Sequence, residues 1–164
     1  MTSTSSLGIY FEKSRIDLVC LRRSFRGFDI NGHLSIDLDQ SKEGPARHIQ
    51  DFIRETRSEN SEVYLGIPKQ EVIAIHLNLP APTEENLREV LGYELDRHTP
   101  YTAEEAYFDF QVTGRDEEKN TIKVLLTVTL KKRLDACLDL LSRTNLIPKS
   151  VEISTTAIIK SVLY

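Results

Sequence analysis

Residues 7–19 carry the sequence LGIYFEKSRIDLV, in which two apolar runs flank a short polar stretch. This pattern predicts a strand at residues 7–11, a tight turn, and a second strand at residues 15–22. Several nucleotide-binding folds begin with such a hairpin, and their turn needs Asp and Gly to approach a phosphate. Here the turn carries Tyr, Phe, Glu and Lys instead. The segment therefore indicates a scaffold rather than an enzyme.

The next segments extend this hairpin into a mixed α/β pattern. A third strand is expected at residues 25–38, interrupted at Asn31-Gly32 because this dipeptide favours a tight turn. Gly44-Pro45 begins an amphipathic helix that ends near Arg57. Residues 62–68 are short and apolar, which predicts a buried strand. The predicted order is β-β-β-α-β.

The second half of the sequence predicts further strands and helices. Thr83 is expected to cap a helix that follows the loop at residues 80–83, with Glu84 and Glu85 in its first turn. Apolar residues of the last helix extend almost to Tyr164, which predicts a fragment of a longer protein. The other expected elements are strands at residues 72–79, 106–112, 121–130 and 150–153, a helix at residues 131–143 that ends at Asn145, and a last helix from Thr155.

Composition and charge exclude several classes of partner. Of the 164 residues, 40% are hydrophobic and 28% are charged, which is typical of a soluble globular chain. The formal net charge is -4 and no basic stripe is present, so nucleic acid is not expected as a partner. No apolar run approaches the roughly 18 residues of a membrane span. Any membrane link is therefore expected from sequence outside this chain or from a partner.

The two cysteines and the N-terminus indicate a reducing compartment. Cys20 and Cys137 lie far apart in the sequence, each within an apolar stretch, so both are predicted to be buried free thiols. Residues 1–6 are polar and lack the features of a secretory signal. The expected location is the cytoplasm.

The sequence contains no pattern typical of a catalytic or metal site. The P-loop, the dinucleotide fingerprint, the nucleophile elbow and the paired Cys or His spacing of zinc sites are all absent from it. Asp109, between two phenylalanines, is expected to point away from them, toward solvent or a seam between subdomains. We therefore predict no catalytic residue, no metal site and no cofactor. The four histidines are expected at exposed or helix-capping positions: His33, His48, His76 and His98.

Several apolar segments follow one another in a characteristic order: Leu65-Gly66-Ile67-Pro68, residues 72–80, residues 87–101 ending in His98-Thr99-Pro100-Tyr101, residues 107–112, residues 124–129, Asn145-Leu146, Pro148 and Val151-Glu152-Ile153. Their order and spacing resemble the PilM family, the actin-like proteins of type IV pilus assembly. The cytoplasmic part of the type II secretion protein GspL, in the same actin-like ATPase superfamily, is similar. The resemblance covers nearly the whole chain.

The resemblance implies an α/β fold of the actin-like, ribonuclease H-like type with a smaller α/β subdomain inserted. Residues 1–68 and 148–164 would form the actin-like subdomain 1A. Residues 69–147 would form the inserted subdomain, similar to 1C. The second large domain of the family, which completes the nucleotide cleft, is expected to be absent from this fragment.

The resemblance also implies a degenerate phosphate turn. Nucleotide-binding members of the family carry an Asp, a Gly and a run of hydroxyl residues in the first hairpin. The Asp position corresponds to Tyr10 and the Gly position to Glu12, and only Ser14 keeps a hydroxyl. A carboxylate in place of the Gly crowds and repels a phosphate. We therefore expect no ATP at this site.

The implied function is that of a non-catalytic adaptor at the cytoplasmic face of the bacterial inner membrane, in a type II secretion or type IV pilus platform. The implied partners are the assembly ATPase and PilN-like or other inner-membrane platform proteins, and homodimer formation is left open. One alternative is an ATP-binding, PilM-like protein whose nucleotide site needs the missing second domain. Another is an unrelated α/β interaction module, because fold alone does not fix function.

Overall fold

The computed structural model describes residues 5–40 and 44–163, and the chain forms two compact units. The first unit comprises Met1–Lys69 and Ala136–Tyr164, and the second comprises Gln70–Asp135. The sequence placed the return to the first subdomain at residue 148, whereas the contacts divide the chain within helix α3 (Lys131–Ser142). Each unit is described by itself below.

A five-stranded sheet forms the centre of the first unit. Its strands are β1 (Ser5–Phe11), β2 (Arg15–Ser24), β3 (Gly27–Asp37), β4 (Glu62–Ile67) and β8 (Pro148–Ile153), in the order β3-β2-β1-β4-β8. The first three strands are antiparallel, and β4 runs parallel to both β1 and β8. Because strand side chains alternate between faces, Leu7, Ile9 and Phe11 of the central strand are all buried on one face.

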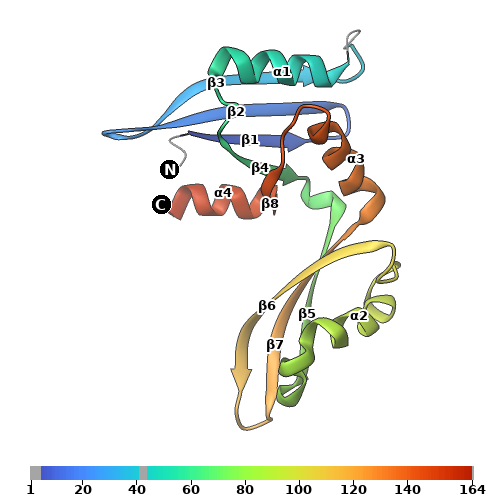
Figure 1. Cartoon of the computed structure of the whole chain (residues 1–164). Helices are drawn as coiled ribbons and strands as arrows, with labels where there is room; N and C mark the ends of the chain where they lie inside the picture. Colours follow the sequence, from blue (N-terminus) through green and yellow to red (C-terminus); the bar gives the residue numbers. More distant parts are fainter. Residues whose placement is uncertain (1–4, 41–43, 164) are drawn as a thin grey trace. The chain divides into compact units, whose positions relative to one another are not determined.

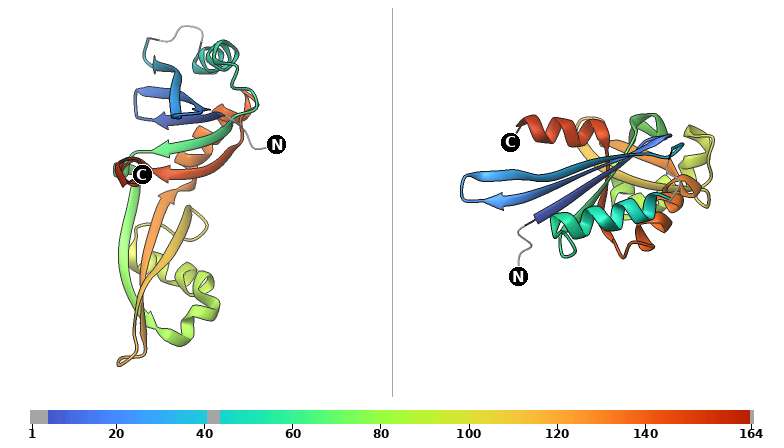
Figure 2. Two further views of the ribbon diagram at one scale, coloured as in Figure 1. Left: turned by 90° about the vertical axis from the view of Figure 1, so that its left-hand side faces the viewer. Right: turned by 90° about the horizontal axis from the view of Figure 1, so that it is seen from above.

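Two helices lie on opposite faces of this sheet (Figures 1 and 2). Helix α1 (Pro45–Thr56) buries Ile49, Phe52 and Ile53 and ends at Arg57, whose left-handed φ of 52° terminates the helix. Helix α4 (Ser154–Leu163) follows β8 on the other side. The face under α1 therefore holds the core of the unit, and the opposite face holds smaller and more polar side chains.

The tight turn predicted at Asn31-Gly32 is wrong. Strand β3 continues through both residues, and Asn31 is the extra residue of a bulge opposite Cys20 and Leu21. Its side-chain amide donates a hydrogen bond to the Thr56 carbonyl at 2.8 Å, so the end of α1 holds it in the strand. The hairpin turns earlier, before Gly27, whose φ of 129° is accessible to glycine.

The second unit is a three-stranded antiparallel sheet with one helix. Its strands are β5 (Val72–Pro80), β6 (Ala106–Asp116) and β7 (Thr121–Leu130), in the order β5-β7-β6. Helix α2 (Leu87–His98) lies beside this sheet (Figure 1). The core is formed by buried aliphatic side chains from both elements: Leu77, Leu87, Leu91, Leu95, Ile122, Val124, Leu126 and Val128.

The two ends of the second unit are fastened together by side chains. A 3₁₀ turn, η1 (Lys69–Glu71), leads into β5, and α3 begins directly after β7. The Arg133 guanidinium Nε lies 2.9 and 2.8 Å from the two carboxylate oxygens of Glu71. The Thr129 hydroxyl donates to the Glu71 carbonyl at 2.9 Å. Glu71 therefore joins the entry of this unit to its exit.

Thr83 does not cap α2, contrary to the sequence-based prediction. Ala81–Asn86 form a second 3₁₀ helix, η2, and α2 begins only at Leu87. The Thr83 hydroxyl donates instead to the Pro80 carbonyl at 2.7 Å. Pro80 and Pro82 fix their φ angles and lack N–H groups, which suits the short, tight turn that precedes the helix.

Two other local predictions are confirmed. Cys20 and Cys137 are both buried, and neither forms a disulfide bond within the described residues. Asn145 adopts a left-handed φ of 59° just after α3, where the helical pattern ends. Among the described residues, no helix combines the length and the hydropathy needed to cross a membrane.

Replacement of Gly32 tests the packing of α1 on the sheet. A Cβ atom at Gly32 would lie 2.8 Å from Thr56 Cγ2 and 3.3 Å from Phe52 Cε2. Because these side chains belong to the buried face of α1, Gly32→Ala should lower the free energy of unfolding by about 1–3 kcal/mol. Urea unfolding of the two proteins, followed by circular dichroism, measures this difference.

Gly92→Ala in α2 is the matched control for this experiment. The nearest atom to its added Cβ is 3.9 Å away, so the substitution should raise stability by about 0.5–1 kcal/mol through helix propensity alone. A Gly32→Ala protein as stable as the parent would contradict the close approach of α1 to β3.

Candidate functional site

The face of the five-stranded sheet opposite α1 contains a pocket of about 790 Å³. We call this surface the open sheet face. Strands β1, β2, β3, β4 and β8 contribute to its floor, and α4 contributes Ser154, Ala157 and Ile158. The other lining residues include Gly8, Tyr10, Asp17, Val19, His33, Ser35, Tyr64, Gly66 and Glu152. The open sheet face is the candidate functional site, because it includes the strand that leads into the predicted phosphate turn.

Glycines on two strands allow side chains to lie flat on this surface. A Cβ atom at Gly66 would lie 3.1 Å from Tyr10 Cδ2, and one at Gly8 would lie 3.2 Å from Val19 Cγ1. Tyr10 is half-buried and pairs with Gly66 across the parallel β1–β4 ladder. Tyr10, the residue that the resemblance assigns to the family's Asp position, lines the pocket with its aromatic side chain.

The β1–β2 turn is closed by its own hydrogen bonds. The Glu12 N–H donates to the Arg15 carbonyl at 2.8 Å, and the Ser14 carbonyl accepts from the Leu38 N–H at 2.8 Å. The backbone N–H of Glu12, the residue that the resemblance assigns to the family's Gly position, therefore already has a hydrogen-bond partner within the hairpin. Ser14, the remaining hydroxyl residue of the turn, is exposed and outside the pocket lining.

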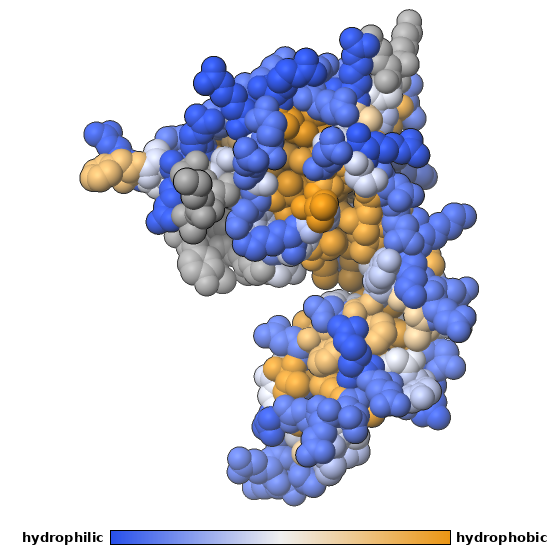
Figure 3. Space-filling model, in the orientation of Figure 1, coloured by the Kyte–Doolittle hydropathy of each residue, from blue (hydrophilic) through white to orange (hydrophobic). Residues whose placement is uncertain are grey.

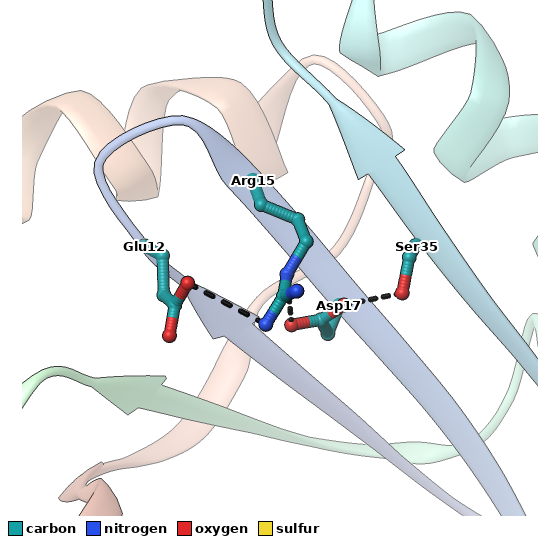
Figure 4. A network of polar contacts seen from close by, with 4 residues as sticks. All are labelled: Glu12, Arg15, Asp17 and Ser35. Atoms are coloured by element: carbon teal, nitrogen blue, oxygen red, sulfur yellow. Dashed lines mark hydrogen bonds and ion pairs between the residues drawn. The ribbon is translucent and has the colours of Figure 1, made fainter.

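Charged side chains connect this turn to the neighbouring strands (Figure 4). The Arg15 guanidinium lies 3.5 Å from the Glu12 carboxylate and 2.9 Å from that of Asp17. The Ser35 hydroxyl of β3 donates to the other oxygen of Asp17. Two carboxylates surround one guanidinium, and with the exposed Lys13 the four charged side chains of residues 12–17 sum to zero. The Glu12 carboxylate opposes an anion such as phosphate, and the Arg15 guanidinium is already paired with two carboxylates.

The sequence prediction missed Arg15, Asp17 and Ser35. Arg15 and Asp17 are two positions apart on one strand, a spacing that places them on the same face and could have indicated their contact. The Asp17–Ser35 contact depends on the pairing register of β2 with β3. That register contains the bulge at Asn31, which the sequence pattern did not predict.

A second polar cluster lies at the border of the open sheet face. Tyr64 donates its hydroxyl hydrogen to a Glu62 carboxylate oxygen at 2.8 Å, and Lys149 Nζ lies 2.7 Å from the other oxygen. The hydrogen bond from Lys149, and then that from Tyr64, lowers the pKa of the Glu62 carboxyl. Hydrogen bonding to Glu62 raises the pKa values of Tyr64 and Lys149. The cluster joins β4 to the β8 side of the sheet.

Outside the open sheet face, the structure places other residues considered from the sequence. Asp109 points outward, with 84% of its side chain exposed, as predicted. Phe108 and Phe110 pack against the core of the second unit, and the Arg88 guanidinium lies 5.1 and 5.6 Å from their ring centres. His98 Nε2 lies 3.4 Å from Glu94. In the described ranges, no group of three His, Cys, Asp or Glu side chains is arranged to hold a metal ion.

Lys149→Gln tests the electrostatic coupling at the border of the pocket. Removing the largest cause of the lowered pKa should raise the pKa of Glu62 toward its ordinary value of 4.5, which a carbon-detected NMR titration of the carboxyl measures. A lowered folded-state pKa contributes stability above the ordinary value and loses it as pH falls through the folded value. The parent should therefore lose more stability on acidification than Lys149→Gln.

The matched control is Lys132→Gln, which removes an exposed lysine from α3. The Glu62 titration should be unchanged in this variant. An unchanged Glu62 titration in Lys149→Gln as well would show that the Glu62–Lys149 pair is absent in solution.

Comparisons with known proteins agree on one family. The family model described as "Type IV pilus assembly protein PilM" matches residues 8–163. The type II secretion system protein L of Xanthomonas campestris pv. campestris is 32% identical over 69 residues, which are 42% of this chain and 18% of that protein. The family match covers nearly the whole chain, whereas the match to protein L covers less than half of it.

Two solved structures share the fold. PilM, in a PilM–PilN type IV pilus biogenesis complex, has a TM-score of 0.72 and 17% identity, over 96% of this chain and 49% of that one. The cytoplasmic domain of EpsL, an inner membrane component of the type II secretion system of Vibrio cholerae, has a TM-score of 0.67 and 15% identity, over 90% of this chain and 56% of that one. The expected actin-like α/β fold is confirmed. The chain spans about half the length of each of these structures.

Proposed function

This chain belongs to the PilM family of type IV pilus assembly proteins, and we propose that it acts as a non-catalytic adaptor in an inner-membrane assembly platform. The resemblance stated from the sequence is confirmed by the family match and by the likeness to protein L of type II secretion. Both indicate a component of a type II secretion or type IV pilus system. The adaptor role itself is our proposal.

The observation that carries this proposal is the closed β1–β2 turn. Tyr10 places its ring in the pocket, Glu12 adds a carboxylate, and the Glu12 N–H is bonded to Arg15. A phosphate needs free N–H groups and positive charge, whereas here the Glu12 N–H is bonded within the hairpin and the Arg15 guanidinium is paired with Glu12 and Asp17. We therefore propose that the protein acts by binding other proteins and catalyses no reaction.

The described relatives suggest the partners. One solved relative forms a complex with PilN, and another is an inner membrane component with a cytoplasmic domain. We propose that this chain binds a PilN-like protein or another platform protein at the cytoplasmic face of the bacterial inner membrane. We further propose that it connects this protein to the secretion or pilus assembly ATPase. Neither role requires a bound nucleotide.

Thermal unfolding of the full-length protein with Mg-ATP tests the absence of nucleotide binding. We expect no change in Tm, because the Glu12 N–H is already bonded, the Glu12 carboxylate repels a phosphate, and Arg15 is paired with carboxylates. A bound nucleotide at 100 times its Kd would stabilise the protein by about 2.7 kcal/mol. Magnesium without ATP is the control. A rise in Tm that a chelator reverses would favour the alternative, an ATP-binding PilM-like protein.

A pull-down with two separate baits tests the adaptor role. The baits are the cytoplasmic tail of the cognate PilN-like protein and the cognate assembly ATPase, and we expect the full-length protein to be retained by at least one. A tail peptide of the same composition in scrambled order is the control for charge-driven retention. Binding to neither bait would contradict the proposed adaptor, even if the nucleotide experiment gave no shift.

A further inference from the structure

The β2–β3 hairpin extends beyond β1 and α1 at one end of the first unit (Figures 1 and 2). We call residues 22–30 the hairpin tip. Three of its side chains are apolar and solvent-exposed: Phe25 is fully exposed, Phe28 is 68% exposed and Ile30 is 71% exposed. Figure 3 shows a small hydrophobic group of atoms among hydrophilic ones at the outer end of this hairpin. These side chains add nothing to the buried core, so folding does not explain why they are apolar.

The hairpin holds these side chains in a fixed arrangement. Ser24 pairs with Gly27, whose positive φ closes a two-residue turn formed by Phe25 and Arg26. Arg23 pairs with Phe28, so these two side chains project from the same face. The hairpin tip therefore presents a narrow, convex apolar end bordered by guanidinium groups.

The charge of the hairpin tip is opposite to that of the chain. The tip contains three arginines and one aspartate, whereas the whole chain has a formal net charge of -4. The Arg22 guanidinium donates to the Thr56 carbonyl at 3.5 Å. Arg23 and Arg26 make no ion pair within the described residues. Two guanidinium groups beside an exposed phenylalanine are thus available to an anionic ligand.

We propose that the hairpin tip binds the surface of a membrane that contains anionic phospholipids. Phe25 enters the interfacial region, where aromatic side chains are favoured, and Arg23 and Arg26 contact lipid phosphates. A convex tip with three apolar side chains is far smaller than the roughly 800 Å² that each partner buries in a standard protein interface. A bilayer surface needs no such area, because charge attraction adds to insertion.

This inference goes beyond the proposed function and does not rest on it. The apolar runs of the sequence predict a membrane link only outside this chain or through a partner, whereas the hairpin tip provides one within the chain. Binding to a PilN-like protein or to the ATPase can fail while the tip binds lipid, and the reverse also holds. Separate experiments therefore test the two proposals.

A single tryptophan at the tip reports directly on membrane contact. The 164 residues of this chain contain no tryptophan, so Phe25→Trp in this chain makes the fluorescence specific to this position. We expect its emission to shift to shorter wavelength with vesicles of equal parts phosphatidylglycerol and phosphatidylcholine, and not with phosphatidylcholine alone. High salt should reverse the shift, since exposed charges are screened. Tyr93→Trp, at a position 74% exposed in the second unit, is the matched control and should not shift.

Arginine substitutions then test the charge contribution. In the Phe25→Trp background, Arg23→Gln with Arg26→Gln should weaken vesicle partitioning about 25-fold, at about fivefold for each arginine. The control pair is Arg54→Gln with Arg97→Gln, which removes the same charge from exposed positions on α1 and α2. Partitioning of the control pair should remain within a few-fold of the Phe25→Trp protein.

Several outcomes would overturn the proposal. They are the absence of a Phe25→Trp shift with anionic vesicles, an equal shift with Tyr93→Trp, and partitioning that is unchanged by loss of Arg23 and Arg26. A Phe25→Trp shift that occurs only with the PilN-like tail or the ATPase would assign the hairpin tip to a protein partner instead. Circular dichroism of each variant verifies that the fold is retained.

Discussion

The burial of one face of β1 is the constraint on which the first unit depends. Leu7 and Ile9 are essentially inaccessible to solvent in the central strand of the sheet, and each contributes on the order of 1.5–3 kcal/mol when buried. Because a strand alternates, fixing these side chains under α1 forces Gly8 and Tyr10 onto the open sheet face. A slip of one residue would reverse both faces. The core therefore determines which residues meet at the candidate site and which remain in the turn.

Much of this architecture follows from local patterns in the sequence. Two patterns indicate the correct elements: the alternation over residues 34–38 and 106–112, and the apolar stripe of Ile49, Phe52 and Ile53. They succeed because each repeat of the pattern places an apolar side chain on the buried face. The sequence predictions fail at residues whose side chain can form either of two hydrogen bonds. Asn31 suits a turn, but its amide reaches the end of α1, and Thr83 suits a helix cap, but its hydroxyl bonds within a 3₁₀ turn. Local propensity cannot distinguish these outcomes.

The candidate site was predictable only in part. Tyr10, Glu12 and Ser14 were identified through a family resemblance, and the structure separates them into a pocket residue and two turn residues. That these three residues prevent nucleotide binding stays a prediction. The link from Arg15 to Asp17 and Ser35 needs strand register, which depends on a bulge stabilised by a distant helix. The exposure of Phe25 also depends on the hairpin turn, because the sequence pattern placed Phe25 at the start of the third strand whereas the structure places it in the turn.

The Glu71 and Arg133 pairing has a consequence for the order of folding. Strand β8 must pair with β4 across residues 68–147, and a flexible chain segment costs more entropy to close as it lengthens. Within the second unit β6 and β7 form a local hairpin, and β5 pairs with β7 across residues 81–120, a shorter segment than 68–147, so these contacts can form earlier. Once Glu71 and Arg133 meet, the intervening chain acts as a short connection. Folding of the second unit thus shortens the loop that the pairing of β8 with β4 must close. The first unit is complete once β8 has been synthesised and has paired.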